Sequence, residues 1–146
     1  MKKLKFSALT LGAAVALALT SNAANAGVMV HLFQWKFNDI ANECETVLGP
    51  KGFDAVQITP PNEHKQGGEW WTVYQPVSYT KFTSRGGNEA ELKSMIQRCK
   101  TAGVKIYVDA VFNQMSDSSG TGSGGSSFGG GTYPAFSAKE FHTACT

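Results

Sequence analysis

The chain has 146 residues, of which 42% are hydrophobic, and its formal net charge is +2. Three of the thirteen Lys and Arg residues and none of the eleven Asp and Glu residues lie before Gly27, so residues 27–146 carry a net charge near −1. This balance, without a Lys/Arg cluster, argues against a nucleic-acid partner. The roughly 120 residues after Ala26 are also too few for a complete eight-stranded β/α-barrel, which takes about 200 or more.

Residues 1–26 have the pattern of a secretory signal peptide. Lysines at the start precede an uncharged apolar run from Phe6 to Leu19, and an A-x-A cleavage signal ends at Ala26. This run is short for a membrane anchor, which needs about 20 apolar residues. We predict cleavage after Ala26, with Ala23 as the alternative. The product is then secreted and extracellular, with no membrane association.

The next residues predict strands that alternate with helices. Apolar runs indicate the strands, 3.6-residue apolar periodicity indicates the first helix, and an Asn-x-x-Glu capping box at Asn88 starts the second. This order predicts a parallel sheet. The expected elements are a strand over 28–33, a helix from Asn38 or Asp39 to Leu48, a strand over 53–58, a loop over 59–87, a helix from Asn88 to about Gly103 and a buried strand over 104–112.

The chain changes character after Gln114. The segment 116–132 is mostly Ser and Gly, which predicts an excursion or a flexible loop. Its glycines lack the spacing of a phosphate-binding loop. A short helix is expected over 138–144.

Polar residues at the end of the third strand are candidates for a site. Asp109 interrupts an apolar strand and Asn113 follows at its end, where ligands bind in α/β folds. Taken alone, Asp109 is more often a structural hydrogen-bonding residue than a catalyst, and Asn113 is most often a turn residue.

The loop over 59–87 carries three large aromatic residues close together, Trp70, Trp71 and Tyr74, followed by Gln75. Aromatic rings stack on the apolar faces of sugars while amides bind the hydroxyl groups. The alternative is a small core beneath the loop, and composition alone does not separate the two. The three histidines have no spacing that indicates a metal site.

Five motifs, in the same order and spacing, resemble α-amylases of the animal and marine-bacterial type, within glycoside hydrolase family 13. They are Val30 to Trp35, Leu48 to Gly52, Val56 to Glu63, Trp70 to Tyr79 and Asp109 to Asn113.

The resemblance implies an α/β fold comprising the first three β/α units of a (β/α)8 TIM barrel, followed by the start of the inserted domain B. The barrel would be incomplete. The implied division is a signal peptide over 1–26, the amino-terminal part of the catalytic barrel over 27–115 and the Gly/Ser-rich start of domain B over 116–146. The full enzyme would hydrolyse α-1,4-glucosidic bonds in starch or glycogen by a retaining mechanism and would be a monomer.

The resemblance also implies roles for individual residues. Asn113 would give one oxygen ligand to a structural Ca²⁺, and Asp109 would be a buried organiser behind the active site. Glucose subsites would be lined by Trp70, Trp71, Tyr74, Gln75 and Gln114.

The chain departs from the family at two positions. Gln114 stands where the family usually has His, and an amide cannot become a cation. Gln34 stands where the family has Glu.

The resemblance places no catalytic residue in this chain. The catalytic carboxylates, most Ca²⁺ ligands and the chloride ligands of this branch would all lie beyond Thr146, so the isolated chain is expected to be inactive. Two alternatives stay open: a secreted, non-catalytic glucan-binding module, and a fragment of a related α-glucan hydrolase or transferase.

Two of the three cysteines are expected to form a disulfide. Cys44 faces inward on the first helix and Cys99 lies on the second, consecutive barrel helices are neighbours, and export permits oxidation. The resemblance points to the same pair. Cys145 would be left without a partner in this chain.

Overall fold

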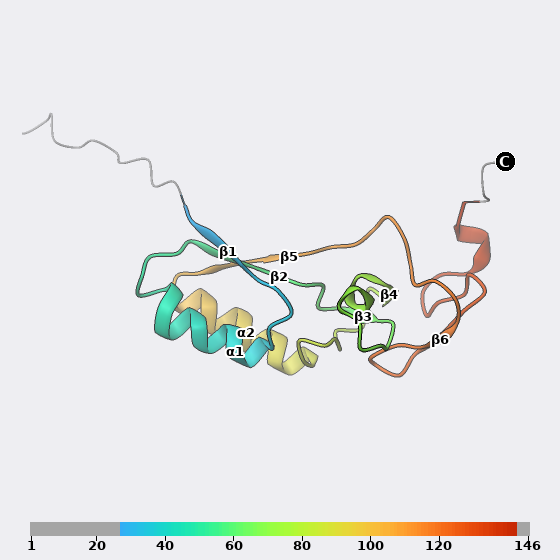
Figure 1. Cartoon of the computed structure of the whole chain (residues 1–146), viewed down its shortest axis with the longest axis horizontal. Helices are drawn as coiled ribbons and strands as arrows, with labels where there is room; N and C mark the ends of the chain where they lie inside the picture. The colour runs from blue at the N-terminus through green and yellow to red at the C-terminus, as the bar shows by residue number, and fades with distance from the viewer. Residues whose placement is uncertain (1–26, 143–146) are drawn as a thin grey trace, which may run out of the picture.

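The computed structural model of the chain describes residues 27–142. It contains a parallel sheet in the order β1-β2-β5, with neighbouring strands in register. The two main helices lie on the same side of this sheet (Figure 1). The elements of this unit are β1 (Met29–Leu32), α1 (Phe37–Glu43), η1 (Cys44–Leu48), β2 (Ala55–Ile58), α2 (Glu89–Thr101) and β5 (Lys105–Val108). The predicted alternation of strands and helices in a parallel sheet is confirmed.

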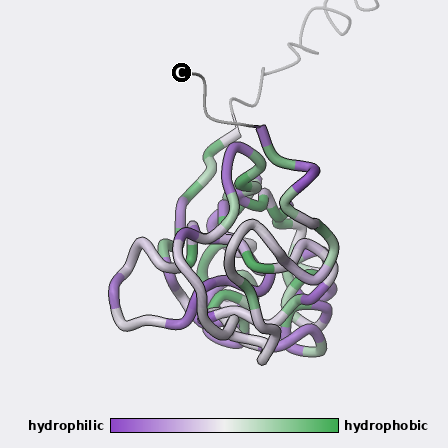
Figure 2. The backbone as a smooth tube through the Cα atoms, turned by 90° about the vertical axis from the view of Figure 1, so that its right-hand side faces the viewer, coloured by the Kyte–Doolittle hydropathy of each residue, from purple (hydrophilic) through white to green (hydrophobic). Residues whose placement is uncertain are grey.

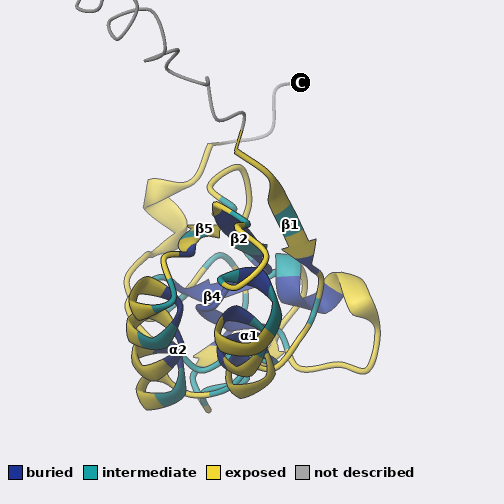
Figure 3. Cartoon of the chain, turned by 90° about the vertical axis from the view of Figure 1, so that its left-hand side faces the viewer, coloured by how far each residue is buried: buried dark blue, intermediate teal, exposed yellow. Residues whose placement is uncertain are grey.

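The hydrophobic core lies between the sheet and the two helices. Side chains of alternate strand residues, such as Val56 and Ile58, pack against helix residues such as Ile40 and Met95. Figure 3 shows the buried faces of both helices turned inward and their exposed faces turned outward. The opposite face of the sheet carries exposed residues such as Tyr107. A parallel sheet normally has both faces covered. Within residues 27–142, only the face that packs against the two helices is covered.

A disulfide joins Cys44 to Cys99, with a Cα–Cα distance of 5.0 Å. Both cysteines are fully buried in the core and connect η1 to α2. The predicted pairing is therefore confirmed. Cys145, the third cysteine, lies outside the described residues, as does the predicted signal peptide.

The two helices begin in different ways. The Asn88 side chain accepts the backbone N–H of Glu91, and the Glu91 side chain accepts that of Asn88, so the predicted capping box is confirmed. The first helix instead begins at Phe37, earlier than the predicted cap at Asn38 or Asp39. The N–H of Phe37 donates to the carbonyl of Gly86 at 2.8 Å, and its ring is buried. This tertiary contact replaces the expected side-chain cap.

The third strand of the sheet is shorter and more exposed than predicted. It ends at Val108, and the stretch to Phe112 is not strand. Val108 is 47% exposed and Phe112 is 79% exposed. The prediction of a buried strand was wrong because β5 lies at the edge of the sheet, where only β2 pairs with it.

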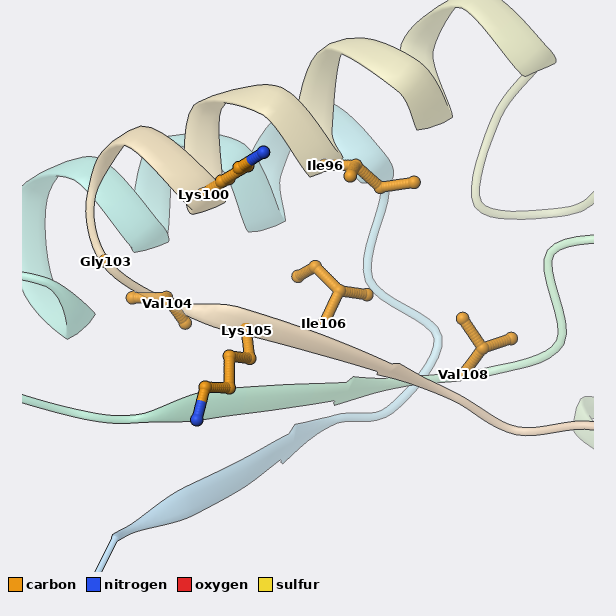
Figure 4. Close-up of a pocket in the computed structure, with 7 residues that line it drawn as sticks. All are labelled: Ile96, Lys100, Gly103, Val104, Lys105, Ile106 and Val108. Carbon is orange, nitrogen blue, oxygen red and sulfur yellow. The ribbon is translucent and has the colours of Figure 1, made fainter.

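The edge strand and the second helix form an apolar groove on the outside of this unit. Figure 4 shows Ile96 of α2 beside Ile106 of β5, with Val104 at one end of the groove and Val108 at the other. Lys100 and Lys105 border it. In the described part of the chain, no helix is long and apolar enough to cross a membrane.

The long connection and the Gly/Ser-rich segment are folded against each other. The side chain of Gln66, in the long connection, donates to the carbonyl of Gly122, in the Gly/Ser-rich segment, at 3.1 Å. Of the two alternatives predicted for 116–132, an excursion or a flexible loop, the structure therefore shows the excursion. The short elements here are β3 (Glu63–His64), η2 (Trp70–Tyr74), β4 (Pro76–Ser78), β6 (Gly120–Thr121), β7 (Ser127–Phe128) and η3 (Ala138–Glu140).

Candidate functional site

The predicted site residues gather at one end of the sheet. The segments that carry β3, η2, β4 and β6 all lie beyond the carboxyl ends of β1, β2 and β5 (Figure 1). Figure 2 looks onto this end and shows hydrophobic and hydrophilic stretches interleaved across it. The tryptophan loop and the segment with Asn113 lie together at this end, since the neighbouring Gln114 side chain donates to the Tyr74 carbonyl at 3.4 Å.

Asp109 connects three elements at this end. One carboxylate oxygen accepts the side-chain N–H of Gln57 on β2 at 2.5 Å, and the other accepts the hydroxyl of Tyr74 on η2 at 2.8 Å. Burial of the Tyr74 hydroxyl and the neighbouring carboxylate raise the pKa of this phenol above its usual range. Asp109 is half-buried rather than buried, because it follows the last residue of the edge strand.

Three rings from two segments form what we call the aromatic platform: Phe33, Trp70 and Tyr74. The Phe33 ring centroid is 6.1 Å from that of Trp70 and 6.5 Å from that of Tyr74, to which it is nearly parallel. Trp70 is 60% exposed, so the platform faces solvent and is not a small core beneath the loop. Sequence reasoning placed Phe33 in a motif but gave it no site role; its position directly after the first strand was the available signal.

Trp71 lies beside the platform and is also partly exposed. The Lys65 ammonium is 5.7 Å from its ring centroid, within cation–π range. The same ammonium pairs with the Asp117 carboxylate at 2.6 Å. Lys65 thus connects the tryptophan loop to the segment that follows β5.

The three predicted amide residues are engaged with the chain itself. The Gln75 side-chain oxygen accepts the N–H of Asp117 at 2.8 Å. The Asn113 amide donates to the side-chain oxygen of Gln114 at 3.0 Å. The Gln75 contact and the bond from Gln114 to the Tyr74 carbonyl hold the segment after β5 against the tryptophan loop. The roles of all three residues in sugar or metal binding stay predictions.

The calcium role predicted for Asn113 stays a prediction. No group of three or more His, Cys, Asp or Glu side chains within residues 27–142 is placed to hold a metal ion. Asn113 has one side-chain oxygen, whereas Ca²⁺ takes six to eight oxygen ligands. A calcium ion at Asn113 would therefore need further oxygen ligands from other groups.

Arg85 is the main contributor that sequence reasoning missed. Its guanidinium donates to the Gln34 side-chain oxygen at 2.8 Å and to the Thr72 hydroxyl at 2.8 Å. It also donates to the backbone carbonyls of Gly67 at 2.8 Å and Glu69 at 3.0 Å. Arg85 therefore holds the exit of β1 against the loop that carries the tryptophans. Nothing in its Ser-Arg-Gly-Gly context indicated this role.

His64 packs beneath the loop and is buried. Its Nδ1 lies 2.8 Å from the Lys65 carbonyl, and its Nε2 accepts the backbone N–H of Arg85 at 3.0 Å. These partners fit the neutral ring with the proton on Nδ1. Burial, with a contribution from the Arg85 charge, lowers the pKa of His64.

Glu63, in the long connection after β2, is fully buried. One carboxylate oxygen accepts the backbone N–H groups of Gly124 at 3.0 Å and Ser126 at 2.8 Å. The Lys81 ammonium lies 4.0 Å from the same oxygen. The other oxygen has no hydrogen-bond partner among residues 27–142. Glu63 thus anchors the β6–β7 hairpin.

Comparison with other proteins gives a consistent relationship. No model of a protein family matches the chain. It is 65% identical over 133 residues to an α-amylase of Aeromonas hydrophila, and 49% identical over 132 residues to an α-amylase of Tribolium castaneum. These matches cover 88% and 85% of the chain but only 30% and 27% of the two relatives. The chain therefore spans less than a third of the length of these relatives.

Solved structures agree with the sequence matches. The wild-type α-amylase I of Eisenia fetida superposes with a TM-score of 0.76 at 44% identity, over 80% of this chain and 25% of that one. A mutant of the same enzyme, solved with maltohexaose, superposes equally well. The fold and the site thus relate the chain to glycoside hydrolases. Specifically, it is a homologue of the α-amylases and matches their amino-terminal portion.

Proposed function

We propose that residues 27–142 form the carbohydrate-binding face of a secreted α-amylase that acts on α-1,4-glucosidic bonds in starch or glycogen. The observation that carries this proposal is the solvent-facing aromatic platform at the carboxyl ends of the strands. The Eisenia fetida enzyme, which shares this part of the fold, has been solved with a chain of six glucose units.

The platform suits a glucan chain on chemical grounds. The CH faces of glucose rings are apolar and stack on indole and phenyl rings, while amides and carboxylates bind the hydroxyl groups. Phe33, Trp70 and Tyr74 provide the rings, with Trp71 beside them. Polar atoms of Asp109 and Gln114 lie next to Tyr74.

Bond cleavage needs groups that the described residues do not place together. A retaining glycosidase uses a nucleophilic carboxylate and a carboxylic acid about 5–5.5 Å apart. Glu63 has no exposed surface and cannot touch a sugar. Both Asp109 oxygens already accept hydrogen bonds from the chain. We therefore expect the chain by itself to bind glucan without hydrolysing it, and the retaining chemistry to belong to the full-length enzyme.

Secretion and the ion cofactors remain part of the proposal. Secretion is supported by the signal-peptide pattern of residues 1–26. Asn113 would contribute one ligand to a structural Ca²⁺, and chloride would be bound by other parts of the full enzyme. The proposed partner is the glucan chain, and the full enzyme is expected to be a monomer.

One observation favours a second candidate, a non-catalytic glucan-binding module. Arg85 and Lys65 hold the tryptophan loop through contacts with Gln34, Thr72 and Asp117, which all lie within residues 27–142. The coding sequence beyond codon 146 separates the two candidates. A continuous reading frame that supplies two active-site carboxylates supports the enzyme, and a stop codon supports the module.

Binding of maltohexaose to the purified chain, measured by isothermal titration calorimetry, tests the proposal. We expect Trp70→Ala to weaken binding by about tenfold or more, because loss of a stacked ring costs at least about 1.4 kcal/mol. Tyr107→Ala removes a comparably exposed ring from the open face of the sheet, beside Val28 and Asp54, and should leave affinity unchanged. Equal affinity of Trp70→Ala and the wild type would disprove a platform-based site.

A further inference from the structure

We propose that Arg85 is a positioning residue that sets the arrangement of the aromatic platform and thereby favours long glucan chains over short ones. This inference rests on the proposed glucan binding and goes beyond it. Its basis is that one guanidinium contacts both segments that supply the rings: the exit of β1, through Gln34, and the loop entering η2, through Gly67, Glu69 and Thr72.

Gln34 transmits this contact to the rings on both sides. Its side-chain oxygen accepts the Arg85 guanidinium, and its side-chain N–H donates to the Trp70 carbonyl at 2.7 Å. In sequence it follows Phe33 directly, and its φ is +59°, in the left-handed region. Non-glycine residues rarely adopt this conformation, and it persists where surrounding contacts impose it. The Arg85–Gln34–Trp70 connection therefore fixes Phe33 relative to Trp70.

Arg85 is itself held by a rigid turn. Ser84 and Gly87 exchange backbone hydrogen bonds of 2.9 and 3.2 Å. Gly86 lies so close to the Phe37 ring that a Cβ there would approach a ring carbon to 2.7 Å. His64 accepts the Arg85 backbone N–H. The guanidinium thus extends from a fixed base, as positioning requires.

The bonding pattern requires arginine. A guanidinium is planar and offers five N–H donors in a fixed fork, whereas a lysine ammonium is a compact charge on a flexible stem. Arg85→Lys keeps the charge but cannot reach Gln34 and the η2 loop with the same geometry. A purely electrostatic role would survive this substitution, and a positioning role would not.

Ligand length provides the discriminating readout. Maltohexaose is long enough to contact several platform rings at once, and its binding depends on the 6.1 Å separation of Phe33 and Trp70. Maltose has only two glucose units and depends far less on how separate rings are arranged. Loosening the platform should therefore weaken maltohexaose selectively.

The test compares Arg85→Lys with the wild type and with Arg98→Lys. Arg98 lies on α2 and pairs with Glu45 away from the platform, so it provides a matched control. We expect Arg85→Lys to bind maltohexaose about tenfold more weakly, which corresponds to a loss of about 1.4 kcal/mol in binding free energy. Its maltose affinity and its Tm should stay close to those of Arg98→Lys. Near-ultraviolet circular dichroism, which reports coupling among the aromatic rings, should change in Arg85→Lys alone.

A second variant keeps the test decisive if Arg85→Lys does not fold. Gln34→Asn tolerates the left-handed backbone but is too short to join Arg85 to Trp70, so it should reproduce the same pattern. Equal loss for maltose and maltohexaose, or an unchanged circular dichroism spectrum in a folded variant, overturns the positioning role. If the wild type binds neither sugar, the proposed function fails. The circular dichroism spectra of the variants still show whether Arg85 sets the arrangement of the platform.

Discussion

Glu63 shows how strongly burial depends on contacts distant in sequence. Its carboxylate replaces water with two backbone N–H groups from the β6–β7 hairpin, 61 and 63 residues away, and with a nearby lysine. A buried carboxylate without such partners would be very unfavourable. Both hairpin donors are backbone N–H groups, which every residue except proline has. The sequence therefore did not indicate that Glu63 would have these partners.

We expect Glu63→Ala to destabilise the chain by about 2–4 kcal/mol, since it leaves two partly buried N–H groups unpaired and creates a cavity. Glu63→Gln retains an acceptor and should cost less. Urea denaturation measures both changes. The exposed Glu69→Ala serves as the control and should stay within about 0.5 kcal/mol of the wild type. Similar midpoints for all variants would show that the hairpin does not depend on this anchor.

Protonation of His64 should weaken the fold as pH falls. Its pKa is lowered in the folded chain, chiefly by burial, so the unfolded chain binds the proton more readily. Stability is therefore fully present above the unfolded pKa of about 6.5 and decreases as pH falls below it. The pKa values of Glu45 and Asp117 are lowered by hydrogen bonds from Arg98 and Lys65, so the stabilisation from these carboxylates is present at neutral pH and is lost only at lower pH than that of His64.

Thermal denaturation between about pH 7.5 and 5 measures this effect. The Tm of the wild type should fall over this range, and His64→Gln should reduce the slope. His31→Gln, at an exposed position, should keep the slope of the wild type. A slope that persists in His64→Gln would assign the pH dependence to another group.

At the scale of elements, the order of strands and helices could be predicted, but some boundaries could not. The capping box at Asn88 is a local pattern whose partners are three residues apart, and it was read correctly. The start of α1 depends on the contact between Phe37 and Gly86, 49 residues apart. The end of β5 depends on which neighbours it has in the sheet. Local sequence contains neither kind of information.

The Cys44–Cys99 disulfide should contribute strongly to the stability of the helix layer. It closes a loop of 55 residues, and a disulfide typically contributes about 2–4 kcal/mol by restricting the unfolded chain. We expect Cys44→Ala/Cys99→Ala to lower the free energy of unfolding by about this amount, measured with urea. Addition of a reductant should lower the stability of the wild type but not that of the double variant. An unchanged wild-type midpoint under reduction would contradict this contribution.

At the scale of the whole molecule, both edges and one face of the sheet stand open in the part of the chain that is described. Val108 and Tyr107 are exposed on the edge strand β5, and the apolar groove beside α2 is continuous with this edge (Figure 4). Unpaired strand edges favour pairing with other chains. We therefore predict that this chain associates by itself, unlike the monomer expected of the full enzyme.

Sedimentation velocity should show concentration-dependent association of the purified chain. Val108→Lys places a charge on the open edge and should weaken association by about tenfold, equivalent to about 1.4 kcal/mol. Lys93→Arg, a conservative change at an exposed position of α2, should have no effect. A wild-type chain that remains monomeric at all concentrations would show that the open edge is protected.

The candidate site was predictable to the extent that its residues form recognisable motifs. Trp70, Tyr74 and Asp109 were proposed from their types and positions, and the structure brings them together. Arg85 and the role of Gln34 were missed because their partners are mostly backbone carbonyls and a side chain 51 residues away. The structure also gives a use for the amide at Gln34, since its N–H donates to Trp70 while its oxygen accepts from Arg85.

We expect this chain to bind α-glucan without positioning a catalytic pair of carboxylates. The decisive measurement is reducing-sugar release from soluble starch, at a chain concentration that saturates maltohexaose binding. We predict binding without release above the blank. Release that Asp109→Asn or Glu69→Gln abolishes would contradict this expectation, because it would identify these carboxylates as the catalytic groups.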